Sequence, residues 1–342
     1  HYWGNSLCNF EESPLQLWGI LLYNKQFERR KKMTQFNNEE YQALVNDLIG
    51  DIFYSETSFR GKISTVRQYA EVIVRKILDI VPNEYMTLGK NEINEKIKHL
   101  QNHEFLENAL KTIRDEGNKC THTQYLGNMT ENDFERIMDS LFDMLAFLLI
   151  EYFEKYEFGS RSDVMRVFSI LPPIIRYKVL KFLYKKYPNN IHIIDRLAMA
   201  IVKAYSIEKA NSWVEQEKNR LVKLNSMSET FKNDIVKQLG LESEEILQNL
   251  FYNRNMYVLC KEKISLIGEQ IKYKGGTLYS DFESALQYYK KYGILSEDSL
   301  EIKEFNDIMN FLYLGRKEKM KELSTENNTY MILNVLEKGR SV

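Results

Sequence analysis

Arginine, asparagine and histidine recur at four-residue steps within RDEGNKCTH, residues 114–122. On an α-helix each such step climbs about 6 Å and turns slightly past a full circle, so Arg114, Asn118 and His122 would form one slanted polar stripe. A histidine near its ordinary pKa can transfer a proton, and an arginine supplies a fixed cation with a fork of donors. The stripe is therefore the constellation in this chain that could act on a phosphate.

The helices that must position this stripe are expected from hydrophobic periodicity, because apolar residues recur at three- and four-residue intervals. Gly117 is expected to let the chain turn where the helix that carries Arg114 ends. Thr130, with Asp133 three positions later, predicts a capped start for the long helix that follows. That helix is apolar on more than one face, so it is expected to pack against more than its own bundle. The helical ranges predicted in this half are 38–54, 63–80, a short segment after residue 88, 104–116 and 130–156.

A second helical domain is expected beyond residue 158, because FGSRSD supplies turn-forming residues before a new helical pattern. Its short paired helices resemble a helical-hairpin array, although their period is too irregular to define a repeat. Such arrays usually offer a surface for a protein partner, and the alternative is that the many tyrosines serve packing. The helices predicted here are 165–171, 174–187, 193–205, 207–224, 229–238, 242–253, 257–271, 281–292, 300–313 and 318–336.

Composition limits the functions that fit. The 342 residues are 44% hydrophobic and 28% charged with a formal net charge of −1, so no overall positive field favours nucleic acid or an anionic membrane. Cys8, Cys120 and Cys260 lie far apart without metal-ligand spacing, which favours a reducing cytoplasm. The longest apolar run of the main body, 144–150, is too short for a bilayer span of about 20 residues. We expect a cytoplasmic protein that has neither a membrane span nor a signal peptide.

The first 32 residues differ from the rest. They hold two of the three tryptophans and lack clear helical periodicity before residue 15. ERRKKM, residues 28–33, can be back-translated as a purine-rich ribosome-binding sequence that runs into a start codon, which points to Met33 as the natural start. The alternative is a genuine arm that packs Trp18 and Leu21 against the body. We thus predict an all-α chain in three parts: an extension over 1–32, a helical bundle over 33–158 and a helical array over 160–342.

Four segments occur in the order and rough spacing of a HEPN-superfamily domain: ISTVRQYAEVIVRKIL, TLGKNEINEKIKHL, IRDEGNKCTH and ENDFERIMDSLFDMLAFLLIEYF. Residues 36–158 most resemble the branch of bacterial domains of unknown function that carries an Arg, a Gly-Asn pair and a His before the final long helix. The resemblance implies a four- or five-helix bundle, commonly a homodimer, with the polar motif facing a cleft at the dimer interface. Many HEPN proteins are metal-independent endoribonucleases of toxin, phage-defence and RNA-processing systems.

The resemblance also implies roles for individual residues. His122 would transfer a proton or orient the phosphate, Arg114 would clamp the phosphate, and Asn118 would position the substrate. Arg67, one turn before Glu71, matches a recurring Arg and Glu of the family, so Arg67 and Lys119 are further candidates for binding RNA. No cofactor or metal is expected. His99 and His103 are four residues apart, but no third ligand is near them in the sequence.

Two features depart from the ribonuclease pattern. Gly117 stands directly before Asn118, and Arg114 lies eight positions before His122, whereas active HEPN nucleases usually have a shorter gap. If the segment stays helical, the arginine and the histidine are about 12 Å apart along the axis. Sharing one phosphate would then require either that the chain folds back at Gly117 or that a second protomer contributes.

Structural roles are the alternative for the same residues. Gly117 and Asn118 could end a helix, His122 could be buried against a backbone carbonyl, and Arg114 could pair with Asp115 or Glu116. Two functions follow from these readings. One is a dimeric HEPN endoribonuclease of a bacterial defence or toxin-like system, and the other is a catalytically inactive HEPN dimerisation module joined to a helical protein-binding scaffold.

Overall fold

The computed structural model describes residues 36–82, 84–122, 125–227, 254–273 and 280–318. Within these ranges the chain is α-helical, without a β-strand and with one isolated bridge between Asn225 and Asn255. The predicted all-α fold class is confirmed. None of the helices in these ranges combines the length and the apolar composition that a membrane span requires. The predicted extension over 1–32, the predicted helices over 229–238 and 242–253, and nearly all of 318–336 lie outside the described residues.

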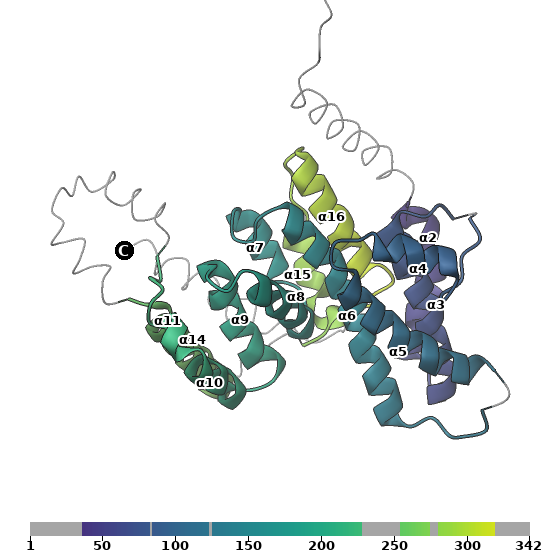
Figure 1. Cartoon of the computed structure of the whole chain (residues 1–342), viewed down its shortest axis with the longest axis horizontal. Coiled ribbons are helices and arrows are strands. Elements are labelled where there is room, and N and C mark those ends of the chain that lie inside the picture. Colours follow the sequence, from purple (N-terminus) through teal and green to yellow (C-terminus); the bar gives the residue numbers. More distant parts are fainter. Residues whose placement is uncertain (1–35, 83, 123–124, 228–253, 274–279, 319–342) are drawn as a thin grey trace, which may run out of the picture.

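The helices before the long central one follow the predicted order (Figure 1). The first begins after Asn37, whose side chain accepts a hydrogen bond from the backbone N–H of Glu39 (2.9 Å), so one free amide of the first turn is satisfied. It then widens into a short π-helical segment, which together with it covers the predicted range 38–54. The bounds are α2 Asn38–Ile49, η1 Gly50–Tyr54, α3 Phe59–Leu78, α4 Asn91–Lys98 and α5 His103–Thr121.

The central helix is α6, Glu131–Lys155, and it has the predicted capping box. The Thr130 hydroxyl accepts a hydrogen bond from the backbone N–H of Asp133 (3.3 Å), while the Asp133 carboxylate accepts one from the backbone N–H of Thr130 (3.0 Å). This hydrogen bond from the Thr130 backbone holds the pKa of Asp133 below its ordinary value. The helix ends at Tyr156, whose backbone is extended.

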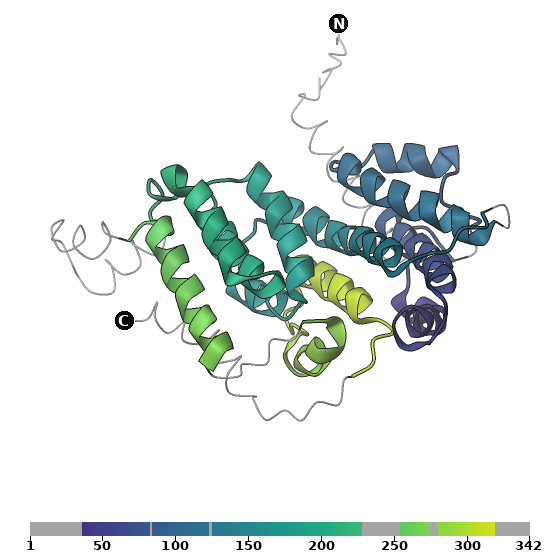
Figure 2. The ribbon, with the colours of Figure 1, turned by 90° about the horizontal axis from the view of Figure 1, so that it is seen from below.

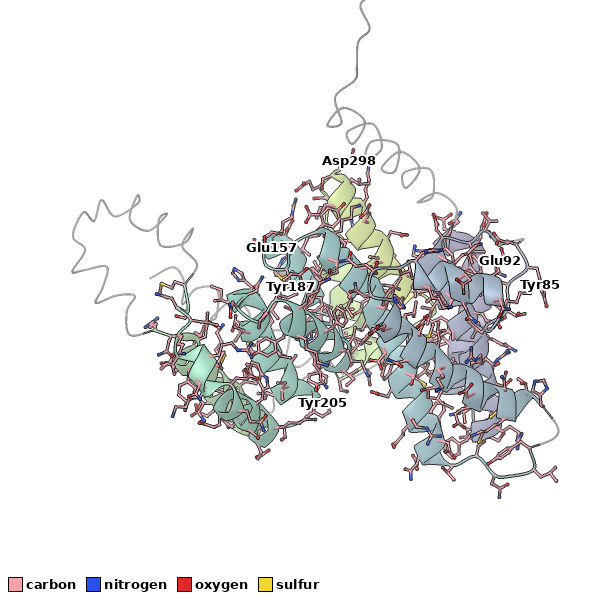
Figure 3. All side chains as sticks on the ribbon, in the orientation of Figure 1. Tyr85, Glu92, Glu157, Tyr187, Tyr205 and Asp298 are labelled. Carbon is pink, nitrogen blue, oxygen red and sulfur yellow. The ribbon has the colours of Figure 1, made fainter. Side chains whose placement is uncertain are left out.

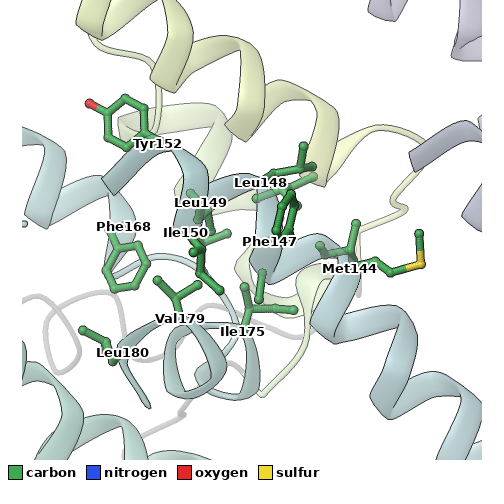
Figure 4. Packing of buried hydrophobic residues seen from close by; sticks show 14 of the residues in the cluster. Met144, Phe147, Leu148, Leu149, Ile150, Tyr152, Phe168, Ile175, Val179 and Leu180 are labelled. Carbon is green, nitrogen blue, oxygen red and sulfur yellow. The ribbon is translucent and has the colours of Figure 1, made fainter. Parts of the chain in front are cut away.

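The middle of α6 is buried on every side. Its residues 144–150 are all buried, so no face of these two turns meets solvent. α3 and α5 pack on one part of its surface, and α8 and α16 pack on others. Figure 4 shows Phe147, Leu149 and Ile150 of α6 beside Phe168, Ile175 and Val179 of the following helices. Burying each large apolar side chain contributes about 1.5 to 3 kcal/mol, and the prediction that α6 contacts more than its own bundle is confirmed.

The next helices agree with the predicted ranges to within a few residues. Proline stands at the first helical position of α8, where its missing N–H costs nothing. Asn190 caps α9 by accepting hydrogen bonds from the backbone N–H groups of His192 and Ile193 (2.9 and 3.2 Å). The bounds are α7 Ser162–Phe168, α8 Pro173–Lys186, α9 Ile191–Ala204, α10 Ile207–Gln216, α11 Lys218–Leu221 and α14 Met256–Tyr273.

Two helices late in the sequence return to the N-terminal helices: α15, Phe282–Tyr292, and α16, Leu300–Tyr313. α16 runs beside α6 (Figures 1 and 2). Asp307 of α16 accepts a hydrogen bond from the Asn38 side chain (3.1 Å) and pairs with Lys76. Tyr313 donates to the backbone carbonyl of Ile170 (3.2 Å). The segment therefore contacts elements on both sides of the predicted domain boundary near residue 158, and that division stays a prediction.

A buried ion pair fixes the end of this returning segment. Arg316, with a side chain 1% exposed, lies 3.1 Å from the carboxylate of Glu283. Its guanidinium sits between the rings of Phe53 and Phe282, with centroid distances of 4.3 and 4.5 Å. Tyr54 donates a hydrogen bond to the same carboxylate (2.8 Å). A side chain of α15 thereby holds both the π-helical end of the first helix and the segment after α16.

We expect Glu283→Ala to lower the free energy of unfolding by about 3 to 5 kcal/mol, because it leaves the Arg316 charge buried without its partner. Urea denaturation followed by circular dichroism measures this. Glu95→Ala removes the solvent-exposed pair with Lys98 and serves as the control that leaves the unfolding midpoint unchanged. Equal midpoints for both variants would contradict a structural role for the buried pair.

A lysine that is only partly exposed to solvent lies on α9. Lys203 lies near the guanidinium groups of Arg176 and Arg196, and burial together with these two positive charges lowers its pKa to about 7. In the unfolded chain a lysine keeps its proton up to a pKa of about 10.4. Between these two values the unfolded state binds more protons than the native state, so this residue makes stability rise with pH.

We expect Lys203→Met to stabilise the protein most below about pH 7, where the native state must otherwise hold a buried ammonium group. The difference in unfolding free energy between the variant and the wild type should shrink as the pH is raised from about 7 toward about 10, because the native lysine is then neutral and the unfolded one begins to lose its proton near 10.4. Urea denaturation of both proteins across this range tests the prediction. A difference that does not change with pH would contradict it.

Candidate functional site

The predicted turn at Gly117 is wrong, because α5 continues through it to Thr121. His122 is the residue after the helix, with extended backbone (φ −98°, ψ 135°), and its N–H donates to the carbonyl of Asn118 (3.1 Å). Neither Gly117 nor Asn118 therefore ends the helix. His122 is exposed, so the alternative of an imidazole buried against a backbone carbonyl is wrong.

A contact with α3 explains the glycine. Gly117 is buried, and a Cβ placed on it would lie 2.5 Å from Cδ and 2.9 Å from Cβ of Arg67. No side chain fits at that separation, so the Arg67 stem crosses α5 only where α5 carries a glycine. The residue serves close helix packing at this point, which outweighs the roughly 1 kcal/mol that a glycine costs inside a helix.

Arg114 and Asn118 lie on α5 and His122 directly follows it, and the three side chains face different surroundings. Arg114 packs on the loop before α4, where a Cβ on Gly89 would lie 3.2 Å from its Cδ, and its Nε is 3.5 Å from Asp115. Asn118 is half-buried and His122 is exposed. Because α5 is unbroken, Arg114 and His122 are about 12 Å apart along the axis. The structure does not bring the arginine and the histidine of one protomer together.

Arg67 lies beside Asn118 rather than beside His122, because its stem contacts Gly117. Its Nη1 is 3.8 Å from Glu71, the predicted intrahelical pair, and its stem contacts the residue before Asn118. The buried Nε of Arg67 has no hydrogen-bond partner within the described ranges. Arg67 thus combines the structural role with a position next to the stripe.

Lys119 lies on another face of α5 and is exposed. It donates to the carboxylate of Glu116 (3.0 Å), and this hydrogen bond raises the pKa of Lys119. Glu116 also pairs with Arg136 of α6 (3.0 Å). Lys119 is positively charged and accessible, as a phosphate contact requires, but it belongs to a bridge between α5 and α6.

Arg60 is a residue of this region that the sequence did not reveal. From the first turn of α3 its guanidinium donates to the carbonyls of Lys119 (3.0 Å), Tyr125 (2.9 Å) and Gly127 (2.9 Å). These carbonyls belong to the end of α5 and to the loop that leads to α6, so Arg60 holds the chain on either side of His122. This role could not be predicted from the sequence, because the three carbonyls come close to Arg60 only when α3 and α5 pack together.

Two exposed apolar side chains follow in the loop after α5, close to Arg60 and Lys119. Tyr125 is 39% exposed and Leu126 is 90% exposed. The Arg60 guanidinium lies 5.6 Å from the centre of the Tyr125 ring, and the Lys119 ammonium lies 6.0 Å from it. Both cations lie over the Tyr125 ring, and aromatic and cationic side chains are the types that contact unpaired bases.

The remaining candidates of this region are Cys120 and the pair His99 and His103. Cys120 lies inside α5 rather than in a turn, and burial raises the pKa of its thiol, which makes the thiolate less available. His103 lies 3.5 Å from Glu107 on the same helix, while His99 is exposed at the end of α4. Across the residues that the structure describes, no group of three or more His, Cys, Asp and Glu side chains could hold a metal ion.

Comparison with family models, with curated proteins and with solved structures finds no match to this chain.

We expect Gly117→Ala to destabilise the protein by about 1 to 3 kcal/mol, because the added methyl overpacks against Arg67. An exposed helical glycine would instead gain up to about 1 kcal/mol from the same change. Gly61→Ala in α3 is the matched control, since its Cβ would meet its nearest neighbour at an ordinary 3.6 Å. Thermal and urea denaturation measure both effects.

The variant Gly117→Ala combined with Arg67→Ala tests the cause. Arg67→Ala removes the Cδ that the methyl would meet at 2.5 Å and leaves the Arg67 Cβ at 2.9 Å, so part of the clash is relieved. The double variant is therefore expected to lose less stability than the sum of the two single changes. Strict additivity would show that the alanine acts through something other than this contact.

Proposed function

We propose that the chain is a HEPN-type endoribonuclease of a bacterial defence or toxin-like system, which acts without a metal ion and as a homodimer. The observation that carries the proposal is the exposed imidazole of His122, which directly follows α5, the helix that carries Arg114 and Asn118. The resemblance of residues 36–158 to HEPN domains and the helical bundle found there support it.

The chemistry assigns each residue a task. The His122 imidazole takes the proton from a ribose 2′-hydroxyl as the oxygen attacks the neighbouring phosphorus, or returns a proton to the leaving oxygen. Arg114 stabilises the extra negative charge on the phosphate, and Asn118 between them orients the RNA. Lys119 and Arg67 add positive charge along the strand, while Tyr125 offers a face for a base.

A second copy of the chain completes the site in this proposal. Within one protomer about 12 Å separates Arg114 from His122 along α5, too far for both to contact one phosphate. A two-fold axis perpendicular to α5 would place the α5 helices of two copies antiparallel and face to face. Arg114 of each copy would then lie opposite His122 of the other. Leu126, 90% exposed in the loop beside His122, is an apolar side chain that such an interface would cover.

The alternative is a catalytically inactive HEPN dimerisation module with a helical scaffold for a protein partner. Two contacts favour it: Arg114 packs against the loop at Gly89 and pairs with Asp115, and Arg67 pairs with Glu71. In that case both guanidinium groups are engaged with carboxylates of their own helices and are not available to a phosphate.

The test uses purified protein with total RNA in EDTA. We expect cleavage by the wild type and a loss of about 100-fold or more in His122→Ala, because general acid–base catalysis contributes at least that much. His99→Ala removes an exposed imidazole at the end of another helix and should leave the rate unchanged. Wild-type protein that cleaves no RNA, or equal rates for the wild type and His122→Ala, would favour the inactive module.

Mixing the two inactive variants tests the composite site. If arginine and histidine act from different protomers, each His122→Ala and Arg114→Ala heterodimer contains one intact site and one site that lacks both groups. Cleavage should therefore return on mixing to about a quarter of the wild-type level, as random pairing of the subunits predicts. Light scattering establishes the dimer independently, and no recovery from a confirmed mixed dimer would contradict the shared site.

A further inference from the structure

A pocket of about 530 Å³ lies far from the stripe, at the other end of α6. It is formed where the last turn of α6 and the last turn of α8 meet the start of α9. Its walls include the apolar side chains of Phe153, Phe158 and Leu183, with Tyr187 and Glu157 at its exposed side. Figure 3 labels Glu157 and Tyr187, which lie close together on the face toward the viewer. The volume is within the range of small-molecule sites.

A buried carboxylate forms part of the same wall. The Glu154 side chain is 4% exposed. One of its oxygens, Oε2, accepts hydrogen bonds from Gln101 Nε2 (3.2 Å), the Tyr187 hydroxyl (3.3 Å) and the Lys186 ammonium. The other oxygen, Oε1, is buried and has no hydrogen-bond partner among the described residues. A buried acceptor without a donor is costly, so Oε1 is a site where an incoming N–H group would be stabilised.

The surroundings favour a positive charge. α6 and α8 both end at the pocket, and a helix C-terminus presents carbonyl groups with partial negative charge. The Glu157 carboxylate adds a full negative charge at the exposed side. Lys155 also lines the pocket, but its ammonium bonds to Glu304 of α16 (2.6 and 2.8 Å). The start of α9 offers little to an anion, because Asn190 already accepts from its first amides.

We propose that this pocket binds a small organic cation, a primary amine or guanidinium that is attached to an apolar body. The charged group donates to Glu154 Oε1, while Lys186 remains on Oε2 and the Glu157 carboxylate supplies the further negative charge. The apolar body rests against Phe153, Phe158 and Leu183. Tyr187, 40% exposed, lies over the carboxylate and turns aside to admit the ligand. The site is separate from the α5 stripe, so it stands or falls independently of the proposed ribonuclease.

Calorimetric titration of the full chain with 2-phenylethylamine tests the proposal. The neutral analogue 2-phenylethanol has the same ring and chain without the charge. We expect saturable 1:1 binding of the amine and at least about tenfold weaker binding of the alcohol, because the alcohol lacks the charge-assisted hydrogen bond. Equal affinity for the two compounds, or no saturable binding of the amine up to about 10 mM, would overturn the proposal.

Three variants locate the binding. Glu154→Gln keeps the shape of the side chain and should weaken amine binding about tenfold or more. Glu151→Gln removes a carboxylate one turn earlier on α6, outside the pocket lining, and should leave the affinity unchanged. Asn189→Trp fills the pocket from an exposed position and should abolish binding without removing any contact of Glu154.

Circular dichroism checks that each variant is folded. Amine binding that survives in folded Glu154→Gln with unchanged affinity would overturn the assignment of the carboxylate. If Glu154→Gln does not fold, Asn189→Trp decides the outcome, because unchanged amine binding in that variant would place the ligand elsewhere.

Discussion

Burial of the middle of α6 on all its faces is the constraint on which the rest of the structure depends. Seven consecutive residues, 144–150, are buried, and in a helix seven consecutive residues cover the full circumference twice. A bundle on one side could cover only one stripe of them. The chain therefore has to bring helices to α6 from before and after it in the sequence, and α3, α5, α8 and α16 do so. The two candidate sites lie at the ends of this helix, where the covering helices begin or stop.

The helices themselves could be predicted because their signals are local. Thr130 and Asp133 lie three positions apart and form the expected capping box, and Pro173 stands at the start of α8. The apolar repeat of α6 also revealed that more than one neighbour was needed. The return of α15 and α16 to the first helices could not be predicted, because a pattern of apolar residues does not say which faces meet. Asp307 alone gives no sign that it binds Asn38 and Lys76.

The candidate site shows the same limit on a smaller scale. A Gly-Asn pair is typical of a helix end, so local reasoning placed a turn at Gly117. The fold overrides that preference, because the Arg67 stem crosses α5 there and leaves no space for a Cβ. Spacing alone predicted the stripe of Arg114, Asn118 and His122, since spacing on a helix is a local property. It could not predict that Arg114 packs on the loop at Gly89, nor that Arg60 holds the chain around His122.

The two ends of α6 are linked through α5. Gln101 and Asn102 donate hydrogen bonds to Glu154 and Glu151 of α6, and the helix that begins at the next residue is α5. α5 is continuous over its 19 residues, so it spans about 28 Å. His122 follows directly at its far end. Because α5 is continuous, it sets the separation between the backbone of His122 and the two residues that bind the carboxylates near the pocket. The same continuity that keeps Arg114 and His122 apart within a protomer thus gives His122 a defined position with respect to the pocket.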